Sequence, residues 1–148
     1  MSANNADEKL LRSLAVALVA HPRGTFKEIA EAAGISKATL NRFCGTRDNL
    51  VAMLMSHGSL VMRQVIDRAG LEVLPVLDGL RRLVEEHLSH QELLAFLTFQ
   101  WRPDTFKEDA GAALWQPYEE ALDAFFLRGQ KEGVFRIDVA APELTEIF

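Results

Sequence analysis

The chain has few residues that form disulfides or break helices: one cysteine, five prolines and nine glycines in 148 residues. A single cysteine, Cys44, excludes an internal disulfide and is typical of proteins in a reducing cytoplasm. Because helix breakers are few and β-branched residues are sparse, the sequence predicts an all-α fold. Apolar residues make up 49% of the chain, which excludes disorder and predicts a packed core.

Membrane-spanning, secretory and enzymatic signals are also missing. No apolar run approaches the ~20 residues of a membrane span. The start, MSANNADEK, has neither the basic nor the apolar region of a secretory signal. The sequence has no G-x-S-x-G, no phosphate-binding P-loop, no G-x-G-x-x-G and no H-E-x-x-H. We therefore expect a cytoplasmic protein with no membrane partner, no enzymatic activity and no cofactor.

The charge is unevenly distributed along the chain. Residues 1–58 hold seven basic and five acidic side chains, a net charge of +2, whereas residues 59–148 hold nine and sixteen, a net charge of −7. A mildly basic head on an acidic body is the asymmetry expected of a small nucleic-acid-binding protein.

The most informative stretch is TFKEIAEAAGISKATLNRFCGTRDNL, residues 25–50. Thr25 and Glu28 form a capping box that starts one short helix at 26–33. Gly34 suits the positive φ of a helix C-terminus, and Ser36 is an N-cap for a second helix at 37–43. Gly45 ends that helix.

Two short helices joined by such a turn form a helix-turn-helix, whose second helix enters the DNA major groove. Leu40 and Phe43 point inward at helical spacing. The outward residues are Lys37, Ala38, Asn41 and Arg42. The alternative is a structural helical hairpin, which the combined caps, spacing and outward polar face disfavour.

Apolar periodicity predicts further helices before and after this stretch. Asn5 and Glu8 resemble a capping pair for a first helix that ends near His21. The later helices are expected at about 47–68, 76–91, 93–101 and 112–132, with a last one from Pro142. Gly58 is expected to bend the 47–68 helix. The segment 93–101 is apolar nearly all round and predicts a central core helix.

Residues 25–50, with the helical segments around them, resemble the tetracycline-repressor (TetR) family of transcriptional regulators. The resemblance implies a DNA-binding head at residues 1–46 and an effector-binding, dimerising body at 47–148. It implies a homodimer on a palindromic double-stranded DNA operator, released by a small-molecule effector. We expect a repressor. The alternatives are a helical small-molecule-binding or dimeric protein whose head no longer reads DNA, and an all-helical enzyme.

The resemblance also implies roles for individual residues of the head. The implied DNA contacts are Thr25, Ser36, Lys37, Ala38, Thr39, Asn41, Arg42 and Arg47. Thr25 and Ser36 match caps that touch phosphates, and Arg42 and Arg47 match backbone-contacting positions. Asn41 stands where the family usually has tyrosine, and an asparagine there is able to hydrogen-bond an adenine edge. Cys44 replaces a usual phenylalanine, and we favour packing over redox sensing for it.

An apolar or aromatic effector is expected in a pocket of the body. The residues assigned to this pocket are Met62, Val65, His87, Phe96, Phe99, Trp101, Trp115, Tyr118, Leu122 and Phe125. For each of them the alternative is ordinary core packing. His87 and His90 have a metal-chelating spacing, but no third ligand stands nearby, so we predict no metal site.

The end of the chain is expected to be incomplete. The TetR family dimerises through two C-terminal helices, and this sequence stops within the first of them. The segment from Pro142 to Phe148 would leave an apolar face uncovered. We therefore expect a truncated body and about two more helices in the natural protein.

Overall fold

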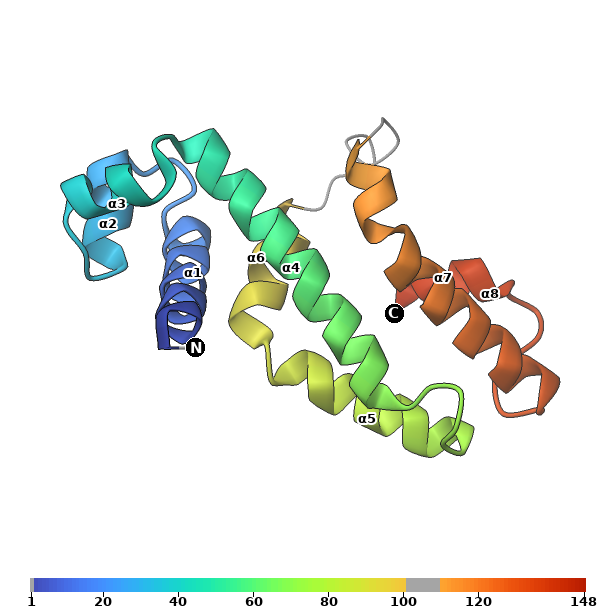
Figure 1. The fold of residues 1–148 in the computed structure, drawn as a ribbon. Helices are drawn as coiled ribbons and strands as arrows, with labels where there is room; N and C mark the ends of the chain where they lie inside the picture. Colours follow the sequence, from blue (N-terminus) through green and yellow to red (C-terminus); the bar gives the residue numbers. More distant parts are fainter. Residues whose placement is uncertain (1, 101–109) are drawn as a thin grey trace. The chain divides into compact units, whose positions relative to one another are not determined.

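The computed structural model describes residues 2–100 and 110–148, and these residues form eight α-helices and no strand (Figure 1). The helices are α1 (Ser2–Ala20), α2 (Phe26–Ala32), α3 (Lys37–Cys44), α4 (Arg47–Ala69), α5 (Val76–Leu88), α6 (Gln91–Gln100), α7 (Ala110–Lys131) and α8 (Ala141–Ile147). The predicted all-α fold is confirmed. In the part of the chain that the structure describes, no helix combines the length and apolar character needed to cross a bilayer.

The helices gather into two compact units. Unit 1 comprises Met1–Gly58 and His90–Trp101, and therefore holds α1, α2, α3, the first half of α4, and α6. Unit 2 comprises Ser59–Ser89 and Arg102–Phe148, and holds the second half of α4 with α5, α7 and α8.

Unit 1 is built on α1, which packs against both α2 and α6. Leu14 and Leu18 of α1 are buried, as are Ile29 of α2 and Leu40 of α3. Gly58 has a packing role here: a Cβ at this position would lie 2.6 Å from Cδ2 of Leu97. The missing side chain thus allows α6 to approach α4 closely.

Unit 2 is held by aromatic packing between α7 and the segment that follows it. The rings of Phe125 and Phe126 lie 5.7 and 5.5 Å from that of Phe135, in tilted or edge-on arrangements. Such arrangements are favourable for aromatic pairs. Gly129 faces the Phe135 ring so closely that a Cβ there would overlap it.

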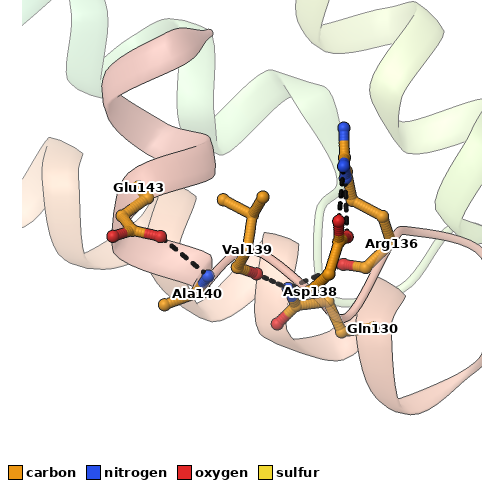
Figure 2. A network of polar contacts seen from close by, with 6 residues as sticks. All are labelled: Gln130, Arg136, Asp138, Val139, Ala140 and Glu143. Atoms are coloured by element: carbon orange, nitrogen blue, oxygen red, sulfur yellow. Dashed lines mark hydrogen bonds and ion pairs between the residues drawn. The ribbon is translucent and has the colours of Figure 1, made fainter.

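The connection from α7 to α8 is also fixed by hydrogen bonds, beyond the packing of Phe135. Figure 2 shows the Gln130 amide donating to the carbonyl oxygens of Arg136 and Val139, at 2.9 and 2.6 Å. Arg136 pairs with Asp138 across two hydrogen bonds, and the backbone N–H of Ala140 donates to Glu143. These bonds fix the loop that leads into α8.

Two sequence expectations are wrong in detail. Asn5 does not cap the first helix, because α1 already begins at Ser2. The 93–101 segment is not buried all round: Leu93, Phe96 and Leu97 are buried, whereas Phe99 is 51% exposed. A stretch that is apolar nearly all round carries little periodic signal, so the sequence alone does not show which of its sides faces solvent.

Candidate nucleic-acid interface

The start of α2 is fixed by the capping box that the sequence predicts. The Glu28 N–H donates to Thr25 Oγ1 at 3.2 Å, and the Thr25 N–H donates to Glu28 Oε2 at 3.4 Å. The two residues therefore satisfy each other's backbone donors at a helix start. Thr25 itself is exposed.

The turn between α2 and α3 follows from one glycine. Gly34 has φ of +78°, a conformation that other residues adopt only with strain. The N–H of Ile35 donates to the Ala30 carbonyl, and the N–H of Gly34 to that of Glu31. This pair of bonds is the Schellman motif, which ends α2 sharply and sends the chain into α3.

The first turn of α3 carries a pair of hydroxyl groups. Ser36 Oγ accepts from the Thr39 N–H at 3.1 Å, and lies 2.8 Å from Thr39 Oγ1. The guanidinium of Arg42 reaches the same Thr39 hydroxyl at 3.5 Å. Two of the predicted DNA-contacting hydroxyls are thus held together at one end of α3.

The outer face of α3 is polar and accessible. Lys37, Ala38, Asn41 and Arg42 are all exposed. The opposite face buries Leu40 completely and Cys44 almost completely.

Cys44 belongs to the packed face of α3. The thiol donates to the Leu40 carbonyl at 3.3 Å, and burial raises its pKa. A protonated, buried thiol is unreactive. Cys44 is therefore a packing residue, and Phe43 is only partly buried beside it.

Arg47, the first residue of α4, has an arrangement that the sequence did not indicate. Its Nη1 donates to the Gly24 carbonyl at 2.9 Å, and its Nη2 to the Pro22 carbonyl at 2.6 Å. Both acceptors lie in the loop between α1 and α2, 23 and 25 residues earlier in the chain. No local pattern signals a contact over such a separation.

The residues assigned to an effector pocket fall into both units. In unit 2, Met62, Val65, Leu122 and Phe125 are buried core residues. In unit 1, Phe96 is fully buried, whereas Phe99 lies on an open apolar groove of about 450 Å³ between α1 and α6. Trp101 lies outside the described residues.

The remaining three residues, His87, Tyr118 and Trp115, contact one another in that order within unit 2, and we call them the polar line. His87 is buried, with Nδ1 2.7 Å from the Leu83 carbonyl and Nε2 2.8 Å from the Tyr118 hydroxyl. The Trp115 and Tyr118 rings meet edge-on, with centroids 6.0 Å apart. Burial raises the pKa of Tyr118 to about 12, so its phenol is neutral. Within the described ranges no three His, Cys, Asp or Glu residues are placed to hold a metal ion.

Comparison with known proteins places this helix-turn-helix in a family. No protein-family model matches the chain. It is 60% identical, over 142 residues, to the HTH-type transcriptional regulator NfxB of Pseudomonas aeruginosa, a match that covers 96% of this chain and 76% of that protein. It is 28% identical over 123 residues to the HTH-type transcriptional repressor LfrR of Mycolicibacterium smegmatis, covering 83% of this chain and 64% of LfrR.

Solved structures agree with these sequence relatives. The TetR-like regulator LfrR from Mycobacterium smegmatis, in complex with proflavine, superposes with a TM-score of 0.66 and 27% identity, over 82% of this chain and 70% of LfrR. The TetR family regulator PfmR from Thermus thermophilus superposes with a TM-score of 0.66 and 22% identity, over 93% and 77% of the two chains, and supports the fold alone. The relatives are transcriptional regulators and not enzymes, as predicted. The chain belongs to the TetR family of helix-turn-helix, DNA-binding transcriptional regulators.

Proposed function

We propose that this regulator is a ligand-responsive repressor, which binds a palindromic operator as a homodimer and leaves it when an aromatic effector binds. The observation that supports DNA binding is the exposed polar face of α3. Lys37, Ala38 and Asn41 are accessible to base edges there, and Arg42 is accessible to the backbone. The hydroxyls of Thr25, Ser36 and Thr39 lie at the starts of α2 and α3, where phosphates are contacted in this type of motif.

The effector side rests on the chemistry of the polar line in unit 2. The Leu83 carbonyl is only an acceptor, so His87 Nδ1 must carry a proton. In a neutral ring Nε2 is then an acceptor, and the Tyr118 hydroxyl donates to it. The lone pairs of the Tyr118 oxygen remain available to a donor on a ligand.

Trp115 supplies the complementary group. Its Nε1–H is buried and has no hydrogen-bond partner among the described residues. An unpaired buried donor is costly, and a ligand that offers an acceptor would relieve that cost. We therefore propose an effector with an aromatic body, one hydrogen-bond acceptor toward Trp115 and one donor toward Tyr118. The structure of LfrR in complex with proflavine, an aromatic compound, supports the proposal of an aromatic effector for the present chain.

The proposed homodimer rests on the apolar surface of α7 and α8. Leu127 of α7 is 44% exposed, and Ile147 and Phe148 at the end of the chain are 75% and 45% exposed. A two-fold interface would cover the same residues on both copies. Sedimentation of the chain at several concentrations tests this part, and a monomer at all of them would refute it.

The test of the effector site uses proflavine as the probe, with DNA absent so that only the protein binds it. Tryptophan fluorescence should be quenched on titration, and the melting temperature should rise. Trp115→Phe and Tyr118→Phe should each weaken this binding about tenfold, the scale of one lost hydrogen bond. The matched control is Phe99→Leu, a change in the groove of unit 1, which should bind as the parent does.

Two results would contradict the proposed site. Equal binding by the parent and both unit 2 variants would show that proflavine binds elsewhere. Weakened binding by Phe99→Leu alone would place the site at the groove between α1 and α6.

A further inference from the structure

The helix-turn-helix hairpin is tied at both of its ends to one residue. Along the chain, α3 passes through Gly45 and Thr46 directly into Arg47, the first residue of α4. Through space, the guanidinium of Arg47 donates to the carbonyls of Pro22 and Gly24, immediately before the Thr25 cap of α2. The 25–45 segment is therefore closed into a loop by this one side chain.

Local geometry makes the two carbonyls available as a pair. The Gly24 N–H donates to the His21 carbonyl at 3.0 Å, which folds the loop between α1 and α2 tightly. A Cβ at Gly24 would lie 2.9 Å from Cβ of His21, so the turn has no room for a larger residue without displacement. The fold of this loop holds the carbonyls of Pro22 and Gly24 within reach of one guanidinium.

Only arginine fits both acceptors at once. Its planar group presents parallel N–H donors that engage two oxygens, whereas a lysine ammonium acts as a single point charge on a flexible stem. Arg47 is partly buried, and its two terminal nitrogens donate to the Gly24 and Pro22 carbonyls. We call this two-pronged contact the fork. While the fork is intact, a phosphate is limited to the Nε–H and to the second N–H of each terminal nitrogen.

We propose that Arg47 is a positioning residue for DNA recognition, whose fork on the α1–α2 loop fixes how α3 is presented to the major groove. The residue acts through α2 and α3 rather than through its own contact with a phosphate. Its contribution therefore depends on the guanidinium shape and not on the positive charge alone.

The test compares charge-retaining and neutral variants of the full chain. The probe is a duplex of about 30 base pairs, enough for two half-sites one turn apart, enriched by the parent from a randomised library. A scrambled duplex of the same composition is the second probe. Arg47→Lys and Arg47→Gln are measured beside Arg42→Lys and Arg42→Gln, because Arg42 is an exposed arginine of α3. All binding is measured at a temperature where circular dichroism shows each variant fully folded.

If Arg47 positions α3, both Arg47 variants lose about tenfold in affinity for the enriched duplex, the scale of one charged hydrogen bond. They lose less on the scrambled duplex, and the dependence of affinity on salt stays that of the parent. Arg42→Lys should bind nearly as the parent, whereas Arg42→Gln should lose affinity on both duplexes and reduce the salt slope by about one unit in each head.

Two outcomes would overturn the proposal. If Arg47→Lys retains the parent affinity while Arg47→Gln reduces the salt slope as Arg42→Gln does, Arg47 contacts a phosphate directly. If both Arg47 variants bind as the parent does and only their melting temperatures fall, the fork contributes to folding and not to recognition.

Discussion

The two compact units use the same device at different places. In unit 1, Arg47 holds the α1–α2 loop through two carbonyls; in unit 2, Arg128 of α7 holds the loop between α4 and α5 through those of Leu71 and Leu74, at 2.5 and 2.6 Å. Arginine suits this task because its fork engages two acceptors in a fixed geometry.

The difference lies in what surrounds the charge. Arg128 Nε is 3.6 Å from a Glu132 carboxylate oxygen one helical turn away. Arg47 has no such carboxylate partner in the described part of the chain, and its contacts lie in the loop that leads into the helix-turn-helix. The fork is therefore a structural element in both units, whereas in unit 1 it also leaves a positive charge without a carboxylate partner among the described residues.

The largest effect is expected from removing the Arg128 fork, and it tests whether this fork stabilises unit 2. Arg128→Gln removes both donors from the Leu71 and Leu74 carbonyls and should lower the free energy of unfolding by about 3 kcal/mol. Urea denaturation measures it. The control is Glu132→Gln, which removes only a half-exposed ion-pair partner and should cost at most about 1 kcal/mol. If the two variants are equally stable, the ion pair rather than the fork holds this loop.

A second prediction concerns the polar line that distinguishes unit 2. Tyr118 is the only tyrosine, so tyrosinate absorbance reports this residue alone. Its pKa is raised by burial to about 12, against 10.0 for the free side chain. The unfolded chain therefore ionises first, and stability should fall as the pH rises from about 10 toward 12, by up to about 2 kcal/mol.

Spectrophotometric titration checks this shift directly. The native protein should titrate near pH 12, and the protein unfolded in guanidinium near pH 10. In Tyr118→Phe, the fall in the free energy of unfolding between about pH 10 and pH 12 should be absent. A native midpoint near that of the unfolded chain would show that Tyr118 is accessible and would remove it from the proposed effector site.

The smallest change in stability is expected at the close packing contacts of two helical glycines, Gly129 in unit 2 and Gly58 in unit 1. Gly129→Ala would drive a methyl group into the Phe135 ring, which is held by Phe125 and Phe126. We expect a net loss of about 1 kcal/mol or slightly more, because overpacking strain exceeds the gain in helix propensity. Gly58→Ala meets only the flexible end of Leu97 and should change stability by less than this. A larger loss for Gly58→Ala in thermal unfolding would reverse this ranking.

The sequence was most informative where structure is local. The capping box of Thr25 and Glu28, the positive φ of Gly34 and the cap at Ser36 are each decided by residues within a few positions, and all are present. The Arg47 fork joins residues more than twenty positions apart, and no spacing rule encodes such a contact.

Burial outside regular periodicity was equally hidden in the sequence. The exposure of Phe99 depends on which side of α6 packs against α1, and a segment that is apolar nearly all round does not reveal that side. Likewise, the separate packing of the two units could not be derived from the order of helices. The assignment of single residues to an effector pocket stays a prediction for that reason.

The proposed function depends most on base reading by the exposed face of α3. The most direct measurement is the affinity of the parent and of Asn41→Ala for the enriched duplex and for its single-base-pair variants. If α3 reads bases, Asn41→Ala should flatten the preference at one base pair of each half-site by ~1–3 kcal/mol and leave the other positions unchanged. Equal losses on every variant and on scrambled DNA would contradict base reading by this residue and return Asn41 to the phosphate backbone.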